Sequence, residues 1–240
     1  MKKSINIGLV IGALLLFTTG CNSVVTGKVK EENISVNKDK AKELEVELNL
    51  GVGEMMVTNG ANEWVEGSIR SNIKNFEPKV SYDLDGKKGK VVIEQSKQKF
   101  KNMKIGNIEN EWNLMLSEDI PMSLDVNVGA ASTKLDLKGI ELKDLDIDAG
   151  VGNLTVDLGG DWEDSFETNI KAGVGKTTIV LPSEVGVKIT SKKGIGSTNI
   201  VDFISKGDGV YVNEAYEDAD VIITVNTDLG VGEVTFKLDK

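Results

Sequence analysis

The chain has 240 residues, with 38 acidic and 28 basic side chains and a formal net charge of −10 at pH 7. This balance argues against a nucleic-acid ligand, because nucleic-acid binding depends on neutralising phosphates. The chain contains no histidine and a single cysteine, which excludes Ser-His-Asp and Cys-His catalysis, histidine-ligated zinc and an intramolecular disulfide.

The first 20 residues have the pattern of an export signal. A positively charged start precedes an apolar run from Ile5 to Phe17, and small residues then lead to Cys21. The apolar run is shorter than the roughly 20 residues of a membrane-spanning helix. Its end at Cys21 resembles the bacterial lipobox, although Thr18 stands where a leucine-like residue is usual. We therefore predict a lipoprotein signal peptide over residues 1–20.

In proteins with a lipobox, a diacylglycerol is attached to the cysteine that becomes the first residue of the mature chain. The resemblance therefore implies an extracytoplasmic protein that is attached to the cell membrane through a lipid on Cys21. An ordinary secreted protein and an uncleaved anchor helix are the alternatives. Residues 21–42 are polar and rich in Lys, Glu and Asn, so we interpret them as a tether.

Residues 43–125 form an N-terminal β region. Leu44, Val46, Leu48 and Leu50 alternate with polar residues, as in a half-buried strand. Two apolar runs flank the segment 85–89, which predicts a hairpin, and a long loop is expected over residues 95–110.

The region 126–240, continuous with the first, is a repeat of a Gly-x-Gly motif followed by an alternating strand. Copies begin at residues 129, 150, 173, 194 and 230, and an earlier copy begins at residue 51. A period of about 20 residues without helical spacing predicts an all-β stack, a β-solenoid in which each rung pairs with the next. The glycines expected at the corners are Gly51, Gly53, Gly129, Gly150, Gly152, Gly173, Gly175, Gly194, Gly196, Gly230 and Gly232.

Three further expectations follow from the repeat. The Val, Ile or Ala between the glycines is expected on the inside of each corner. The longer last step contains an insertion over residues 203–220, interpreted as a loop or cap. The charged end of the chain, residues 235–240, is expected to form one edge of the stack.

The repeat resembles the toast-rack family of bacterial envelope proteins and the C-terminal domains of cell-wall-active antibiotic response proteins. The matching features are Gly51–Glu54, the segment from Trp112 to Pro121, the Gly-x-Gly rungs from 150 to 232, and Leu181-Pro182. The resemblance covers residues 44–240 and implies a toast-rack-like envelope domain. Some members of these families modulate envelope-stress signalling through membrane partners, but they typically carry several transmembrane helices.

Two catalytic interpretations can be weighed against the sequence. Residues 173–178 resemble the end of a phosphate-binding loop, but Ile170 stands where that motif needs a glycine, and a strand rather than a helix follows. A carbohydrate-active enzyme with paired carboxylates remains an unfavoured alternative, since no acid pair lies beside aromatic residues in a recognisable setting. The protein is therefore predicted to be no enzyme and to need no cofactor.

Five aspartates lie on the polar phase of predicted strands. Stacked rungs would bring some of them close together, and clustered carboxylates bind hard cations such as Ca²⁺. A solvated face with interleaved lysines is the favoured interpretation, and cation binding is the alternative. The residues are Asp125, Asp136, Asp146, Asp148 and Asp157.

The function predicted from the sequence is a non-enzymatic β-scaffold that binds a protein or a cell-wall partner. Accessory regulation of the envelope-stress or antibiotic response is the second hypothesis.

Overall fold

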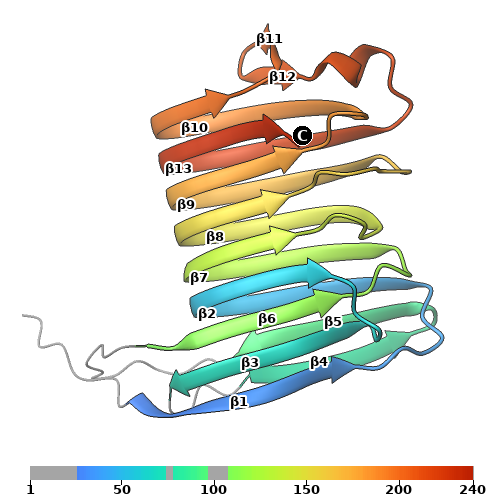
Figure 1. The fold of residues 1–240 in the computed structure, drawn as a ribbon, viewed down its shortest axis with the longest axis vertical. Coiled ribbons are helices and arrows are strands. Elements are labelled where there is room, and N and C mark those ends of the chain that lie inside the picture. The colour runs from blue at the N-terminus through green and yellow to red at the C-terminus, as the bar shows by residue number, and fades with distance from the viewer. Residues whose placement is uncertain (1–25, 74–77, 97–107, 240) are drawn as a thin grey trace, which may run out of the picture.

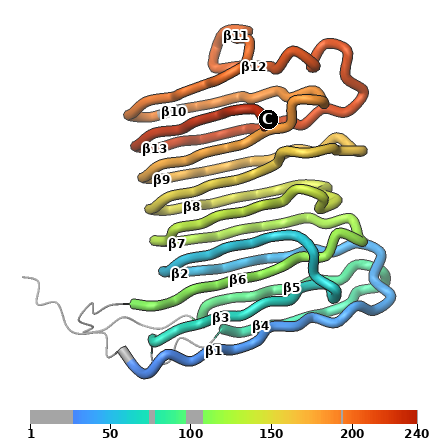
Figure 2. Tube along the Cα trace, viewed as in Figure 1, coloured from blue at the N-terminus to red at the C-terminus, as the bar shows by residue number. Residues whose placement is uncertain are grey.

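The computed structural model describes residues 26–73, 78–96 and 108–239. Thirteen strands in this part of the chain form one continuous sheet, folded into a tall stack with two layers (Figures 1 and 2). The all-β, solenoid-like prediction is confirmed. The elements are β1 (Thr26–Val36), β2 (Glu43–Asn59), β3 (Val65–Ile73), β4 (Pro78–Asp85), β5 (Lys88–Gln95), β6 (Asn110–Leu116), β7 (Met122–Asp136), β8 (Leu142–Asp157), β9 (Phe166–Leu181), β10 (Gly186–Ile200), β11 (Ile204–Gly207), β12 (Val210–Val212), the 3₁₀ helix η1 (Glu214–Glu217) and β13 (Ile222–Leu238).

Six long strands, β2, β7, β8, β9, β13 and β10, form the rungs. Each runs along the back sheet, bends at its Gly-x-Gly or Gly-Ala-Ala segment, and returns along the front sheet, which faces the viewer in Figure 1. Neighbouring rungs are parallel and in register through the bend. The repeat is therefore one bent strand per rung, and all bends lie along one edge of the stack.

The bend reverses the inward and outward phase of the strand. In β2 the buried positions before the bend are even-numbered and those after it are odd-numbered, as in Leu48 and Leu50 followed by Met55 and Val57. The residue between the glycines therefore lies on the outside of the corner. Val174, for example, is 49% exposed, so the prediction of an inside position is wrong.

The order of the rungs differs from their order along the chain. Strand β13 lies between β9 and β10, pairing with both of them in parallel. The C-terminal strand is thus in the interior of the stack, and the prediction that residues 235–240 form an edge is wrong. The insertion before β13 returns the chain to a gap that β9 and β10 leave between them.

The insertion forms the upper end of the back sheet. Strands β11 and β12 pair with each other, and β12 pairs with the first half of β10. The buried Asn213 completes this cap. Its side-chain oxygen accepts a hydrogen bond from the Val187 N–H at 2.8 Å, and its amide nitrogen donates to the Val185 carbonyl at 2.7 Å. The predicted loop or cap is present as a cap.

The lower end is built from the N-terminal region. The front sheet ends in β6, β3 and β1, and the back sheet ends in the hairpin β4–β5, whose predicted position is confirmed. Residues 26–36 form the edge strand β1, so the tether predicted over 21–42 differs from the structure from Thr26 onward. The alternation that hides Ile34 and Val36 in the core explains the difference, because the polar residues around them face solvent.

At the bend of β2, the lowest bend of the stack, side chains form the hydrogen bonds that the backbone of a further rung would otherwise form. The Gln95 oxygen accepts hydrogen bonds from the Gly51 and Val52 N–H groups at 2.7 and 3.2 Å. The Asn110 amide donates to the Val52 carbonyl at 2.6 Å, and the Trp112 indole N–H donates to Asn110 at 3.1 Å. These contacts satisfy backbone groups that higher rungs satisfy with one another.

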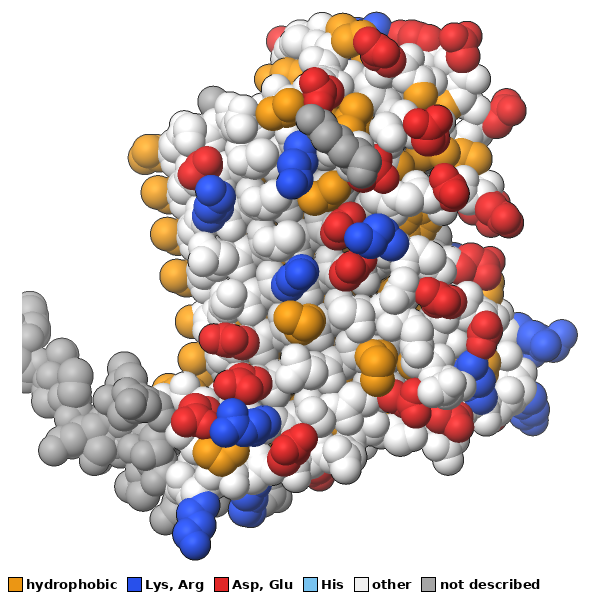
Figure 3. All heavy atoms as spheres, in the orientation of Figure 1, with side chains coloured by type: hydrophobic (Ala, Val, Ile, Leu, Met, Phe, Trp, Pro, Cys, Tyr) orange, Lys and Arg blue, Asp and Glu red, His pale blue; other side chains and the backbone are white. Residues whose placement is uncertain are grey.

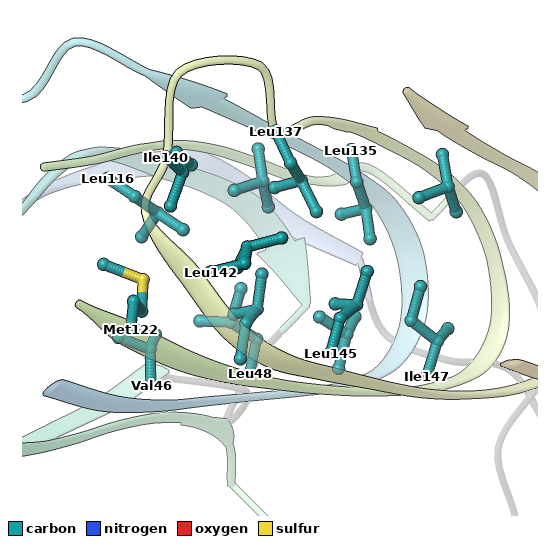
Figure 4. Close-up of a cluster of buried hydrophobic side chains, with 14 of the residues drawn as sticks. Val46, Leu48, Leu116, Met122, Leu135, Leu137, Ile140, Leu142, Leu145 and Ile147 are labelled. Atoms are coloured by element: carbon teal, nitrogen blue, oxygen red, sulfur yellow. The ribbon is translucent and has the colours of Figure 1, made fainter. Parts of the chain in front are cut away.

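The core is a ladder of aliphatic side chains between the two sheets, which Figure 4 shows in close-up. Val46, Leu124 and Leu145 stand in register on successive rungs and are almost fully buried. One cluster of buried residues runs from β1 to β13, so the N-terminal and repeat regions share a single core. The three tryptophans, at 64, 112 and 162, are also buried.

Candidate functional site

The lipidation residue predicted from the sequence, Cys21, lies outside the described residues. The corner glycines all lie within strands, where rungs approach one another closely. A Cβ built on Gly150 would lie 2.5 Å from the Gly129 carbonyl oxygen, and one built on Gly175 would lie 1.8 Å from that of Gly152. Their role is therefore to permit close stacking of backbone on backbone.

The structure divides the five aspartates between the two sheets. Asp125, Asp146 and Asp148 lie on the outer face of the back sheet, where Asp125 and Asp146 are neighbours in register. Asp136 and Asp157 are neighbours on the front sheet, and the Lys138 ammonium lies 3.4 and 3.1 Å from them. No group of three or more acidic residues suited to a metal ion occurs among the described residues. Asp136 and Asp157 thus share a lysine partner, as the solvated-face interpretation expects.

Asp125 lies in an unfavourable electrostatic position. Partial burial, followed by the charges of Glu47 and Asp146 on the neighbouring rungs, raises the pKa of its carboxyl group above the usual value. The Asn127 amide donates a hydrogen bond to it at 2.8 Å, which only partly offsets these effects. At neutral pH the ionised Asp125 therefore lowers the stability of the fold.

The substitution Asp125→Asn is expected to stabilise the protein at pH 7. The folded state binds the Asp125 proton more tightly than the unfolded state, so stability falls as pH rises from the usual aspartate pKa through the raised one. Removing the charge is expected to raise the free energy of unfolding by about 0.2–1 kcal/mol, the range of a cross-strand pair. Thermal unfolding at pH 7 and pH 3 measures the gain, which should disappear at pH 3.

Asp148→Asn is the matched control, because Asp148 has Lys171 in register on the next rung. We expect no stabilisation from it at either pH. Equal gains from both substitutions would contradict the electrostatic explanation.

A shallow hollow lies on the outer face of the front sheet. Its volume is approximately 750 Å³, and β1, β2, β3 and β6 form its floor and rim. Met56 and Met115 are 43% and 39% exposed there, and this face is turned to the viewer in Figure 3. We call it the methionine hollow; it is lined by Glu31, Asn33, Ile34, Ser35, Met56, Thr58, Asn62, Glu66, Gly67, Ser68, Asn113, Leu114 and Met115.

The methionine hollow has the chemistry of a binding surface. Methionine side chains are flexible and polarizable and adapt to differently shaped partners, while amides, hydroxyls and carboxylates surround them. A smaller concavity of approximately 260 Å³ adjoins the hollow, shares Met56 and Asn113 with it, and adds Lys134 and Glu111. Together the two concavities offer an apolar floor with a polar rim across five neighbouring strands.

The two carboxylates of the methionine hollow are not arranged like those of a glycosidase. Glu31 stands opposite Arg70 in the β1–β3 pairing, and Glu66 is four residues further along β3. Their backbone positions are thus roughly 13 Å apart at strand spacing, so both side chains would have to extend toward each other for the carboxyl groups to reach the separation of about 5–9.5 Å found in glycosidases. Glu66 also accepts a hydrogen bond from the Asn62 backbone N–H at 2.7 Å. This arrangement does not support the carbohydrate-active alternative.

Sequence reasoning missed the methionine hollow. Met56 and Met115 are 59 positions apart and become neighbours only because β2 and β6 pair in parallel, with Thr58 opposite Met115. The one available signal was an apolar side chain on the outward phase of each strand, where polar residues prevail.

No helix in the described part of the chain has the length and apolar character needed to cross a membrane.

Bent parallel strands stacked about a single aliphatic core make this protein a stacked, solenoid-like β-protein. The family model for the N-terminal domain of toast_rack matches residues 25–180, and the model for the C-terminal domain of the cell wall-active antibiotics response protein LiaF matches residues 128–236. The chain belongs to the toast-rack family, as the resemblance of its rungs implied.

A solved structure is closely similar to the chain. It is a protein of Clostridium sporogenes with a provisional assignment to cell adhesion, 33% identical, with a TM-score of 0.86 over 88% of this chain and 100% of that one. Provisionally assigned adhesins of Bacteroides fragilis and Parabacteroides distasonis align over 87% and 89% of this chain and 97% and 98% of their own, with 8% and 13% identity and TM-scores of 0.28 and 0.22. The fold comparison therefore rests on the first structure. None of the curated proteins matches the chain.

Proposed function

We propose that the chain is a lipid-anchored scaffold of the bacterial envelope that binds a protein or cell-wall partner through the methionine hollow and performs no catalysis. The observation that carries the proposal is the hollow itself, an exposed methionine pair with a polar rim on a rigid sheet. A rigid surface loses little conformational entropy when it binds. The adhesion assignment of the Clostridium sporogenes structure agrees with a binding role.

Site-specific photo-crosslinking in living cells tests the binding surface. A photoreactive residue in place of Met115 is expected to give a covalent adduct with protein or wall material. The same residue at Thr224, on the outer face of the back sheet, serves as the matched control and should give none. An absence of adducts above background at both positions would refute the hollow as the binding site.

The anchor is tested by Cys21→Ser. Loss of the thiol removes the attachment point of the diacylglycerol, and several acyl chains are what makes membrane attachment stable. The variant is expected to move from the membrane fraction to the soluble fraction, as measured by fractionation and by mass spectrometry of the mature N-terminus. A Cys21→Ser variant that stays in the membrane would support an uncleaved helix instead.

A regulatory role in the response to wall-active antibiotics is the second candidate. It rests on the match of residues 128–236 to the C-terminal domain of LiaF. Deleting the gene should then change the induction of wall-stress reporters by such antibiotics. An unchanged response in the deletion strain would eliminate this role.

A further inference from the structure

The outer edge of the rung bends carries a continuous row of aliphatic side chains. Each rung contributes the residue between its two glycines, or the equivalent alanine, and Figure 3 shows the row along the left edge of the molecule. Four of the six are large and well exposed: Val151 at 56%, Val174 and Val231 at 49%, and Ile195 at 77%. We call this row the bend ridge; it consists of Val52, Ala130, Val151, Val174, Val231 and Ile195.

The bend ridge is straight because its members stand in register from rung to rung. Rungs are about 4.8 Å apart, so the row from Val52 to Ile195 is roughly 24 Å long. The phase reversal at the bend holds each side chain outward, away from the core. A single sequence position repeated on every rung therefore produces one apolar line on a convex edge.

The described chain begins at the same edge. Thr26, the first residue of β1, pairs with Ile73, and Ile73 packs against Val52 at the lower end of the bend ridge. Cys21 precedes Thr26 by five residues, which span at most about 18 Å. The opposite edge of the stack, at the far end of the 11-residue β1, is roughly 33 Å away. A lipid on Cys21 would therefore enter the bilayer on the ridge side.

The charges beside the bend ridge permit contact with a membrane. The positions three before and two after each ridge residue hold three lysines and four carboxylates, so this edge is nearly neutral although the chain carries −10. Lysines at such positions can extend their ammonium groups toward lipid phosphates while their stems lie on apolar surface. The flanking charged residues are Lys171, Lys176, Lys192, Glu54, Asp148, Asp228 and Glu233.

The shape of the bend ridge also favours a lipid surface over a protein. The six side chains in single file are far fewer than the 20–30 residues that each partner contributes to a stable protein interface. A convex line cannot enclose a small ligand, but it can sink into the soft headgroup and acyl boundary of a bilayer, where binding increases with the apolar area buried.

We propose that the bend ridge lies in the interfacial region of the phospholipid bilayer to which the chain is anchored, with the axis of the stack parallel to the membrane. The inference rests on the lipid anchor proposed above. The anchor supplies attachment, and the ridge fixes orientation, so that the methionine hollow faces sideways along the membrane. A partner would then approach the hollow parallel to the membrane surface.

Depth-dependent fluorescence tests this orientation in the full mature lipoprotein. The variants Val174→Cys and Ile195→Cys carry an environment-sensitive fluorophore at the middle and far end of the ridge. Glu163→Cys, in the loop between β8 and β9 at the opposite edge, is the matched control. Each is reconstituted in phosphatidylethanolamine–phosphatidylglycerol vesicles with and without brominated acyl chains, and mass spectrometry verifies the lipid on Cys21.

Both ridge probes are expected to show blue-shifted emission and at least about twofold quenching by the brominated lipids, with no change at residue 163. A lipidated, vesicle-bound protein whose ridge probes behave like residue 163 would overturn the ridge proposal and leave the anchor intact. Quenching at residue 174 alone would overturn the parallel orientation. A blue shift that depends on protein concentration but not on bromine would assign the ridge to a second copy of the chain. Absence of the lipid would refute the anchor and the ridge contact together.

Discussion

Gly175→Ala is expected to lower the free energy of unfolding by about 4 kcal/mol or more, at the upper end of single-substitution effects. Gly175 has φ = +146°, and an added Cβ would lie 1.8 Å from the Gly152 carbonyl oxygen on the next rung. Backbone atoms cannot rotate away as a side chain can, so the rungs must separate and lose hydrogen bonds and core contacts on both sheets. Equilibrium urea denaturation followed by circular dichroism gives the change.

Gly60→Ala is the matched control, because it shows the cost of placing alanine at a positive φ without a steric clash. Gly60 also has a positive φ, +90°, but no atom lies within 4 Å of the position that an added Cβ would take. Its substitution should cost only the left-handed backbone penalty of about 1–2 kcal/mol. Equal denaturation midpoints for the two variants would show that close rung stacking does not limit stability.

Deleting residues 221–240 is expected to abolish cooperative folding of the upper half of the stack. The deletion removes β13, which pairs along its length with both β9 and β10. It also removes the buried Phe236 and Val225 from the core and leaves β10 without its partner toward the rest of the stack. The loss should exceed about 5 kcal/mol, the lower end of the stability of ordinary domains. Calorimetry and limited proteolysis measure the effect.

A chain that begins after residue 36 is the control for this deletion. It lacks β1, an edge strand that pairs only with β3. It should remain folded with a lower melting temperature, because the deletion removes a strand from the edge of the sheet and leaves only one edge of β3 unpaired. If both truncated chains melt alike, the interior position of β13 does not contribute to stability in the way the strand order implies.

The bend ridge could be partly predicted from the sequence, whereas the methionine hollow could not. The ridge positions were visible as the middle residue of each Gly-x-Gly motif, but the apolar character of these residues led to the prediction that they lie inside the corner. The change from even to odd buried positions between Leu50 and Met55 indicates that Val52 points outward instead. The hollow had no comparable signal, since its methionines come from strands that the chain does not place next to each other.

The sequence by itself determined the composition of the rungs. Alternating aliphatic residues define which side chains of each strand face the core. Paired glycines define where the backbone must bend and stack closely. These are local properties, fixed by the two-residue period of a strand and by the missing Cβ of glycine.

Only the tertiary structure decided which rung lies beside which. Parallel rungs join through backbone hydrogen bonds that are nearly the same for any pair, so the repeat does not encode that β13 enters between β9 and β10. The same non-local pairing turned residues 26–36 into an edge strand and aligned six aliphatic residues into the bend ridge.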